Sequence, residues 1–415
     1  MQNDSHLAIN GGLPVRQRPM PPRHLVGREE KRMVDQVFAH VIETGEMFRY
    51  AGKYEERYQN SFVDFLGGIG SADCVNSGTN ALFAALGALE LEPGSEVIVP
   101  AITDAGGLMP ILYQLLVPVV SDVDARSYNI SADQVALLIT PRTKAIIVSH
   151  IAGEPAVIDA IADLAQKNNL VLIEDCSQSH GAEYDGAKVG TFGDIAVFST
   201  MATKHHCTGG QGGVIFSKDR TLIEKAKQTA DRGKLYEQGS YTGRNVSLGL
   251  NCNLDELSAA IGCAQIKKLP KIISATHWIG ETLKESLDQG SDVASVGWQP
   301  ENSKCVYWFV RIKLALEKIS VGKEQFSDAL IAEGIPVGNE YRSAPFEQEW
   351  LNTPLARSFL GSKRLADLMG TRSALPNVEK ALSEHINIFI RESYGKQEIE
   401  DILRAIEKVE DAYQN

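Results

Sequence analysis

The sequence lacks the cysteine patterns that mark disulfide frameworks and structural zinc sites. Only six of its 415 residues are cysteine, and no two of them form a CxxC pair. Zinc sites and small secreted domains both depend on cysteines at close, regular spacing. We therefore expect six free thiols in a reducing compartment, most of them buried as small apolar groups.

Basic residues are too few, and apolar runs too short, for several other classes of protein. The 41 Lys and Arg residues against 53 Asp and Glu residues give a net charge of −12, which repels nucleic acids and anionic membranes. No apolar run reaches the roughly 18 residues of a membrane span, and the opening MQNDSHLAINGG has no signal-peptide pattern. We expect a cytoplasmic protein without nucleic-acid or membrane partners.

Strand-like and helix-like segments alternate through the middle of the chain. Continuous β-branched runs occur at 95–100, 117–123, 144–151, 170–175, 195–200 and 212–217, and helical patterns at 80–91, 104–115 and 156–169. This alternation indicates an α/β fold with a mostly parallel sheet that is covered on both faces. Ligands of such sheets bind at the carboxyl ends of the strands, so polar residues there are the candidates for chemistry.

Changes in pattern divide the chain into three parts. Residues 1–30 form a proline-punctuated arm, residues 31–290 a large domain that ends in a long helix through Pro270, and residues 291–415 a smaller domain. In the smaller domain CVYWFVRIKL (305–314) predicts a strand, and helices are predicted near 322–334, 376–386 and 396–413.

Two segments place polar groups where such a sheet binds ligands. In VNSGTNAL, Gly78 and Thr79 open a helix whose free N–H groups suit a phosphate, although a plain Ser/Thr cap would read the same. In LVLIEDCSQSHG, Asp175 ends an apolar strand, where a carboxylate needs a cationic partner such as a protonated pyridine nitrogen. Gln178 follows it with hydrogen-bonding capacity. The alternative is a surface loop that begins one residue earlier.

The segment FSTMATKHHCTGGQGG carries Ser199 at a strand end, then Lys204 and His205, and then four glycines. Consecutive His-His-Cys side chains do not converge on one ion, so we predict no metal site here. A lysine in a partly dry cleft loses its proton and attacks carbonyl groups, whereas a solvated surface lysine does neither. Both readings of Lys204 stay open on this segment alone.

Two further sites are weaker candidates. In SLGLNCNLDELSAA, Asn251 precedes a helix, which by itself predicts only a capping turn. In the smaller domain, Trp308, Tyr341 and Arg342 are candidates to face a substrate, with ordinary core or surface positions as the alternative.

Together and in this order, these segments resemble the DegT/DnrJ/EryC1/StrS family of sugar aminotransferases. The match runs from LAINGGLPVR through SGT, ED, VGTFGDIAVFS, Lys204, GQGG and the GLNCNLDE turn, about residues 7–270, and the rest agrees in general layout. The resemblance implies the pyridoxal-phosphate-dependent transferase fold type I. In this fold a mostly parallel seven-stranded sheet forms the large domain, and a smaller α+β domain follows. It also implies a homodimer with shared active sites.

The resemblance assigns roles to these residues as well. Lys204 would hold pyridoxal 5'-phosphate as an internal aldimine and move protons on the way to a pyridoxamine 5'-phosphate intermediate. Asp175 would pair with the ring nitrogen, and Gln178 would contact the ring hydroxyl. The phosphate would be held by Gly78, Thr79 and Ser199, with Asn251 reaching in from a second subunit.

The implied reaction moves an amino group from glutamate or glutamine to a keto or aldehyde carbon of a sugar. The acceptor would be a sugar nucleotide, an octulosonic-acid-type sugar or a cyclitol, for amino-sugar or polysaccharide biosynthesis. One departure from the family concerns the ring: its usual aromatic neighbour is missing from VPAITDAGG, which has Asp104 near that place. Either another side chain covers the ring, or the stack is absent.

The residue that aligns with the family's lysine depends on the direction of counting. Counting forward from Ser199 selects Lys204, whereas counting back from GQGG selects His205. A histidine there is typical of a family branch that removes a sugar 3-hydroxyl as a dehydratase. We favour the transaminase because a lysine is present and histidine cannot form the aldimine. A catalytically inactive regulatory relative is the other alternative, and the retention of Lys204, Asp175 and Ser199 argues against it.

Overall fold

A seven-stranded, mostly parallel sheet forms the centre of the large domain. The computed structural model describes residues 6–237, 240–339, 341, 349–359, 361 and 375–415. The strands, in the order in which they lie in the sheet, are β1 (Ser71–Val75), β9 (Gly213–Ser217), β8 (Ile195–Ser199), β5 (Val171–Asp175), β4 (Thr143–Ser149), β2 (Glu96–Pro100) and β3 (Val117–Ser121). All neighbours are parallel except the two pairs that involve β9. The predicted fold class is confirmed.

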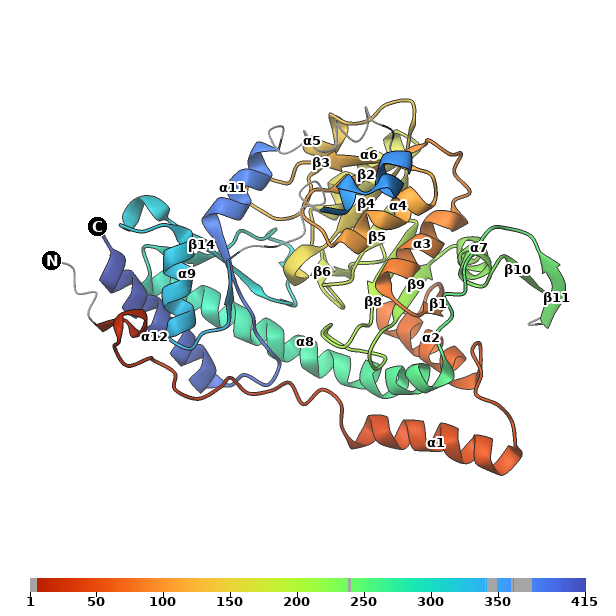
Figure 1. Ribbon diagram of the computed structural model, residues 1–415, viewed down its shortest axis with the longest axis horizontal. Coiled ribbons are helices and arrows are strands. Elements are labelled where there is room, and N and C mark those ends of the chain that lie inside the picture. The colour runs from red at the N-terminus through yellow and green to blue at the C-terminus, as the bar shows by residue number, and fades with distance from the viewer. Residues whose placement is uncertain (1–5, 238–239, 340, 342–348, 360, 362–374) are drawn as a thin grey trace.

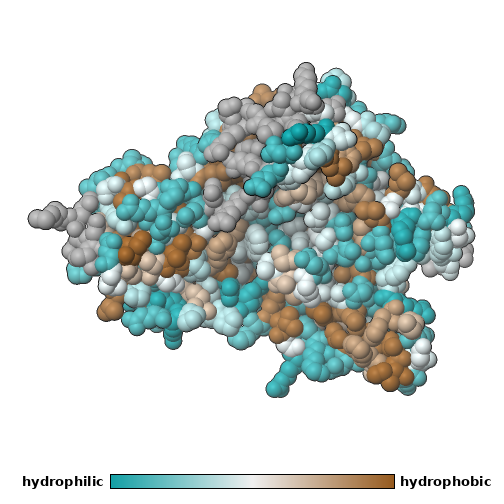
Figure 2. Space-filling view, viewed as in Figure 1, coloured by the Kyte–Doolittle hydropathy of each residue, from teal (hydrophilic) through white to brown (hydrophobic). Residues whose placement is uncertain are grey.

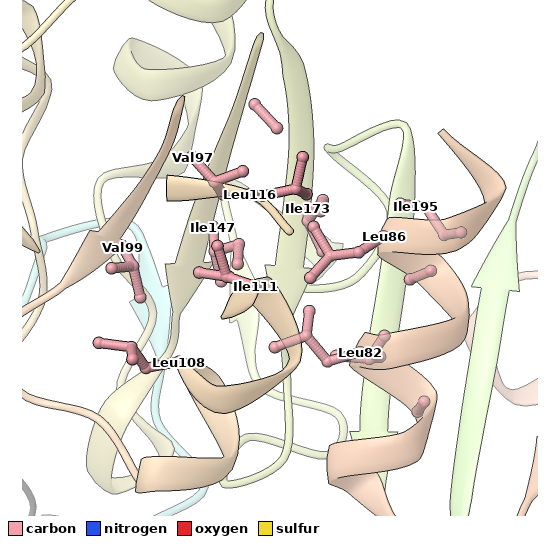
Figure 3. Packing of buried hydrophobic residues seen from close by; sticks show 14 of the residues in the cluster. Leu82, Leu86, Val97, Val99, Leu108, Ile111, Leu116, Ile147, Ile173 and Ile195 are labelled. Atoms are coloured by element: carbon pink, nitrogen blue, oxygen red, sulfur yellow. The ribbon is translucent and has the colours of Figure 1, made fainter. Parts of the chain in front are cut away.

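Helices cover both faces of this sheet because its strands are apolar on both sides. They are α1 (Arg28–Thr44), α2 (Lys53–Leu66), α3 (Gly78–Ala88), α4 (Met109–Tyr113), α5 (Ala132–Ala136), α6 (Ile158–Lys167), α7 (Arg220–Ala230) and α8 (Glu256–Gly290). Figure 3 shows Leu82 and Leu86 of α3 packed with Ile111 of α4 over Val97, Ile147 and Ile173 of the sheet. The alternating pattern in the sequence predicted most strands of this sheet, but β1, α1, α2, α5 and α7 were missed.

The smaller domain is built on an antiparallel sheet with the order β12 (Ala294–Val296), β14 (Val310–Leu314), β16 (His385–Ile388) and β15 (Val337–Gly338). The helices α9 (Lys323–Ala332), α11 (Pro376–Glu384) and α12 (Lys396–Tyr413) agree with the predicted ranges. Short strands β6 (Glu183–Tyr184), β7 (Ala187–Lys188) and β13 (Ser303–Lys304) form a separate sheet, and β10 (Lys234–Glu237) and β11 (Ser240–Asn245) form a hairpin.

The strand predicted over 305–314 forms only in its second half. Tyr307 has a φ of 44°, a left-handed conformation that a strand cannot contain. The backbone N–H groups of Val306 and Trp308 instead donate to Gly153 and Ala152 of the large domain. The prediction was therefore wrong for residues 305–309, which connect the two domains next to the carboxyl end of β4.

Helix α8 and the N-terminal arm both join the two domains. Figure 1 shows α8 running from beneath the large sheet to the smaller domain, without interruption at Pro270. Its last turns contribute Ile279 and Leu283 to the smaller domain's core, together with Leu7 of the arm. Arg16 of the arm forms buried ion pairs with Glu398 (3.1 Å) and Asp401 (2.7 Å) of α12. The last turns of α8, which the prediction assigned to the large domain, thus pack in the core of the smaller domain.

The six cysteines are free and buried, as predicted. Among the described residues, no helix is both long enough and apolar enough to cross a membrane.

Candidate active site

A cavity of about 210 Å³ lies at the carboxyl ends of β2, β4, β5 and β8, beside the first turn of α3. This is the place where a sheet of this kind binds ligands. It brings together the predicted residues Gly78, Thr79, Asp175, Gln178, Ser199 and Lys204.

The first turn of α3 packs directly against the end of β8. Ser77 caps the helix through a hydrogen bond from the backbone N–H of Asn80 to its Oγ (3.1 Å). A Cβ added to Gly78 would lie 2.7 Å from the Cβ of Ser199, and one on Gly213 would lie 2.5 Å from the Ser77 carbonyl oxygen. Glycine is therefore required at both positions. The packing leaves helix N–H groups and the Ser199 hydroxyl on the wall of one cavity, which suits an anion.

The last two residues of β5 point their carboxylates to opposite sides of the strand. Asp175 lines the cavity, and its Oδ1 accepts a hydrogen bond from the N–H of Ser177 (3.0 Å). Glu174 is fully buried and accepts from the backbone N–H groups of Gly190 and Gly193 (both 2.7 Å). Strand β5 thus ends at Asp175, and the alternative of an earlier loop is wrong.

Glu174 lies with His150 and Cys176 in a cluster of metal-ligand type. His150 accepts from the Ala156 N–H through Nδ1 (3.0 Å), so its Nε2 carries the proton that bonds Glu174 (3.1 Å). Burial alone would raise the pKa of Glu174, but the His150 and backbone hydrogen bonds outweigh it and lower that pKa. Hydrogen bonds therefore account for this cluster without an ion.

Lys204 is buried, and its Nζ lies 3.9 Å from the centroid of the Trp308 ring. Burial lowers the pKa of Lys204 to about 8, although the charges of Asp175 and Asp104 act in the opposite direction. No hydrogen bond to Nζ occurs within the described part of the chain. With this pKa, about one molecule in ten has an unprotonated Lys204 amine at pH 7, against about one in 3,000 for an ordinary lysine.

Gln178 connects the cavity to the smaller domain. Its Oε1 accepts from the N–H of Ala152 (2.9 Å), and its Nε2 donates to the Tyr341 hydroxyl (2.6 Å). Tyr341 and Trp308 therefore both reach the residues of the predicted site. Arg342, predicted beside Tyr341, lies outside the described residues.

His205 does not line the Lys204 cavity. Its Nε2 lies 3.2 Å from the Val306 carbonyl oxygen, and its ring borders a neighbouring cavity of about 330 Å³. His206 points inward, where it bonds the hydroxyl of Tyr58 (2.7 Å) and the Nδ1 of His180 (2.9 Å). The expectation that His205 meets a substrate beside Lys204 thus has no support in the geometry.

Asn251 is exposed and does not border the cavity of its own chain. Its Oδ1 accepts from the Asn253 side chain (2.7 Å), which also donates to Asp231 (3.0 Å). The prediction that Asn251 serves a second subunit's site stays a prediction.

Several residues of the cavity wall were missed. Thr103, Ser149 and His150 follow or end β2 and β4, so the rule that placed Asp175 would also have found them. Asp104, where an aromatic residue was expected, accepts from the N–H of Gly106 (2.8 Å) and caps a short turn. Of the described residues that line the cavity, His150 alone carries a ring.

Residues 28–407 match the model of the DegT/DnrJ/EryC1/StrS aminotransferase family. The chain belongs to this family. It is an aminotransferase. A putative L-glutamine:3-amino-2,3-dideoxy-scyllo-inosose aminotransferase from Streptoalloteichus tenebrarius is 30% identical over 416 residues, 98% of each chain. GDP-perosamine synthase from Vibrio cholerae is 35% identical over 239 residues, 57% of this chain and 63% of that enzyme.

Solved structures agree with this assignment of the aminotransferase. An aminotransferase from Psychrobacter cryohalolentis superimposes with a TM-score of 0.81 at 25% identity, over 94% of this chain and 98% of that one. NtdA from Bacillus subtilis, solved with bound cofactor PMP, has the same fold (TM-score 0.78, 24% identity, 95% of this chain and 86% of that one).

Proposed function

We propose that this aminotransferase uses pyridoxal 5'-phosphate to move an amino group from glutamate or glutamine to a keto or aldehyde carbon of a sugar. The acceptor is a sugar nucleotide, an octulosonic-acid-type sugar or a cyclitol. The observation that carries the proposal is the joint position of Lys204, Asp175 and the first turn of α3 around one cavity. A buried lysine with a lowered pKa, next to a carboxylate, is the arrangement that amine chemistry on a carbonyl needs.

The residues of the cavity fit the cofactor at each of its polar ends. The N–H groups of Gly78 and Thr79 and the Ser199 hydroxyl would hold its phosphate, and the Asp175 carboxylate would pair with its ring nitrogen. When bound, pyridoxal phosphate supplies an electron sink for the carbanion that forms as a proton leaves carbon. Gln178 would approach the ring from the side of Tyr341.

Lys204 would be the group that binds the carbonyl carbon and moves the proton. Its lowered pKa leaves a usable share of free amine near neutral pH, and that amine is the nucleophile and the base. The same amine returns the proton to carbon when the acceptor takes up nitrogen. Trp308 lies against Nζ, and its ring would shield one side of the amine from water.

The identity of the acceptor is supported by the relatives rather than by the cavity. The relative that aligns over 98% of both chains is named for a cyclitol ketone and for L-glutamine as donor. GDP-perosamine synthases, named for a sugar nucleotide, align over shorter stretches. We therefore rank cyclitol ketones first and sugar nucleotides second, with Tyr341 and Trp308 as the residues that would face the acceptor.

We also propose a homodimer in which Asn251 reaches the partner's phosphate. Exposed apolar side chains gather over α1 and the segment that follows it, where Figure 2 shows a brown patch, and beside the turn of Asn251. The side chains over α1 and its following segment are Phe38, Ile42, Met47 and Phe48, and those beside Asn251 are Leu248 and Leu250. Burial of such a patch against a second copy would favour association.

Borohydride reduction of the protein loaded with pyridoxal phosphate, followed by peptide mapping, tests the proposal. We expect the cofactor tag on Lys204 and, in separate assays, transfer of nitrogen from glutamine to a cyclitol ketone. Replacement of the exposed Lys218, whose Nζ donates to the Thr191 carbonyl (2.7 Å), should leave both results unchanged. An untagged protein that removes a sugar hydroxyl would favour the dehydratase. A protein that neither binds the cofactor nor turns over would favour the inactive relative.

A further inference from the structure

Three consecutive carbonyl groups around Lys204 are bound by one guanidinium group from the N-terminal arm. Arg23 donates from Nη1 to the carbonyl oxygens of Thr203 (2.9 Å) and Lys204 (2.7 Å). Its Nη2 donates to the carbonyl oxygen of His205 (3.3 Å). An arm residue 181 positions away in sequence therefore holds the backbone of the residue that carries the reactive amine.

The backbone of the loop supplies no donor for these carbonyl groups in the described part of the chain. The loop is closed at its ends by the hydrogen bonds Ala202 N–H to Gly210 (3.2 Å) and Thr208 N–H to Thr200 (3.0 Å). In the described part of the chain, no backbone N–H donates to the carbonyls of residues 203–205. Carbonyl groups left in that position cost free energy unless a side chain or water binds them.

Arg23 is itself held in place from the smaller domain. Its Nε lies 3.2 Å and 3.0 Å from the two carboxylate oxygens of Glu392, and the Arg23 and Glu392 side chains are only 20% and 12% exposed. Trp308 adds a further bond from Nε1 to the Thr203 carbonyl (3.1 Å). Arg23 thus bonds Glu392 through Nε, which leaves Nη1 and Nη2 for the carbonyl groups of the loop.

We propose that Arg23 is a positioning residue that holds the Lys204 loop so that the amine stays against the Trp308 ring, inside the cavity. This inference rests on the proposed role of Lys204. Arg23 touches neither the cavity nor the Lys204 side chain, so it acts only through the backbone. The charged groups that act on the amine itself are Asp175 and Asp104.

The test is the pH dependence of Lys204 labelling in the cofactor-free, full-length protein. Trace acetic anhydride reacts with free amines, and peptide mass spectrometry gives the labelled fraction of Lys204 at each pH. A loosened loop lets water reach Nζ, so Arg23→Gln should raise the pKa of Lys204 from about 8 by about one unit toward the ordinary value. The turnover number of the loaded enzyme should fall about ten- to a hundredfold with the KM for the donor nearly unchanged.

Arg391→Gln is the matched control. Arg391 borders the same 330 Å³ cavity as Arg23, and its side chain makes no contact with the Lys204 loop in the described structure. Its loss removes one positive charge from the lining of that cavity and should leave the labelling curve and the turnover number unchanged. Arg23→Lys should restore part of both because it keeps the charge and some of the donors.

The outcomes separate this inference from the proposed function. If Arg23→Gln labels and turns over like the wild type, the positioning role is wrong even when Lys204 carries the cofactor. If the wild type takes up no cofactor, the proposed function fails, and the labelling curves still report on the loop. Should Arg23→Gln fail to fold, Glu392→Gln replaces it as the test, because it removes the group that holds Arg23. A wild-type labelling curve in Glu392→Gln would then overturn the proposal.

Discussion

The Lys204 ammonium group lies over the face of the Trp308 ring, with Nζ 3.9 Å from the ring centroid. A cation above an indole is attracted by the ring quadrupole, most strongly for tryptophan among the aromatic residues. Burial lowers the pKa of this lysine, and the charges of Asp175 and Asp104 limit that fall. The attraction of the ring for the cation acts in the same direction as these charges. The site thus balances a dry environment against groups that favour the charged amine.

Trp308→Phe should shift this balance toward the free amine. Phenylalanine keeps a ring against Nζ but attracts a cation less. A whole cation–π contact contributes about 0.5–2 kcal/mol and phenylalanine keeps part of it, so the pKa of Lys204 should fall further below about 8, by roughly half a unit. Arg23 still binds the Thr203 carbonyl that Trp308 would release. The labelling curve of Lys204 measures this shift. The pKa should fall in Trp308→Phe, whereas it should rise in Arg23→Gln.

Trp298→Phe is the control for this prediction. Trp298 also stacks on a cation, Arg126, at 3.8 Å, but it does not line the Lys204 cavity. Its replacement should leave the Lys204 curve in place. A rise in the pKa of Lys204 in Trp308→Phe would mean that the indole acts mainly by excluding water.

Lys204→Met should make the cofactor-free protein more stable. The pKa of Lys204 is about 8 in the folded protein and 10.5 for an ordinary lysine. Between pH 8 and pH 10.5, Lys204 is therefore protonated in the unfolded chain and largely unprotonated in the folded chain. The difference corresponds to at most about 3 kcal/mol, and we expect a gain of about 1–3 kcal/mol at pH 7. The gain should shrink as pH rises from 8 to 10.5, because wild-type stability rises over that range.

Urea unfolding of both proteins at pH 7 and at pH 9.5 measures this difference. Lys218→Met is the control, since Lys218 is exposed and its replacement should change stability little at either pH. A Lys204→Met protein that is less stable than the wild type at pH 7 would contradict the conclusion that the amine is held dry at a cost to folding.

Gly78→Ala should weaken cofactor binding without unfolding the protein. The added Cβ would lie 2.7 Å from the Ser199 Cβ and 3.1 Å from its Cα, so α3 and the end of β8 must move apart. Overpacking of this kind costs about 1–3 kcal/mol, and it displaces both groups of the expected phosphate site. We expect the Kd for pyridoxal phosphate to rise about tenfold or more in a fluorescence titration.

Gly210→Ala is the matched control in the neighbouring glycine cluster. An added Cβ at Gly210 meets no atom within 4 Å, and the residue has no left-handed φ. Its Kd for pyridoxal phosphate should equal that of the wild type. Equal affinities for Gly78→Ala and Gly210→Ala would place the phosphate elsewhere.

The sequence predicted those residues of the site whose position depends on a single strand end or helix start. An apolar run that ends in a polar residue gave Asp175, and a Ser-Gly-Thr helix start gave Gly78, because each signal lies within a few residues. Arg23 and Glu392 are 369 positions apart, and no local pattern relates them. The break at Tyr307 has the same cause, since the N–H groups on either side of it bond a loop of the other domain.

The cavity that His205 borders could also not be predicted from neighbouring residues in the sequence. Lys204 and His205 are adjacent residues in a stretch of turns and bends, and Lys204 borders the cavity whereas His205 does not. Counting residues cannot decide which of the two borders it. The buried bonds of His206 to Tyr58 and His180 hold the next ring inward.

Tyr58→Phe tests whether that inward anchor serves folding. The Tyr58 hydroxyl lies 2.7 Å from Nε2 of His206, and both side chains are fully buried. Burial lowers the pKa of His206 to about 3, so its ring is neutral and needs a donor at Nε2 when Nδ1–H faces His180. The variant leaves that nitrogen unpaired, which should cost about 1–3 kcal/mol of unfolding free energy. Denaturant titration of the cofactor-free protein measures this loss of stability.

Tyr241→Phe is the control, because its hydroxyl donates to Asn245 Oδ1 (2.8 Å) at the exposed surface, where water can replace that bond. Unchanged stability in Tyr58→Phe would show that the histidine pair holds its place without the tyrosine.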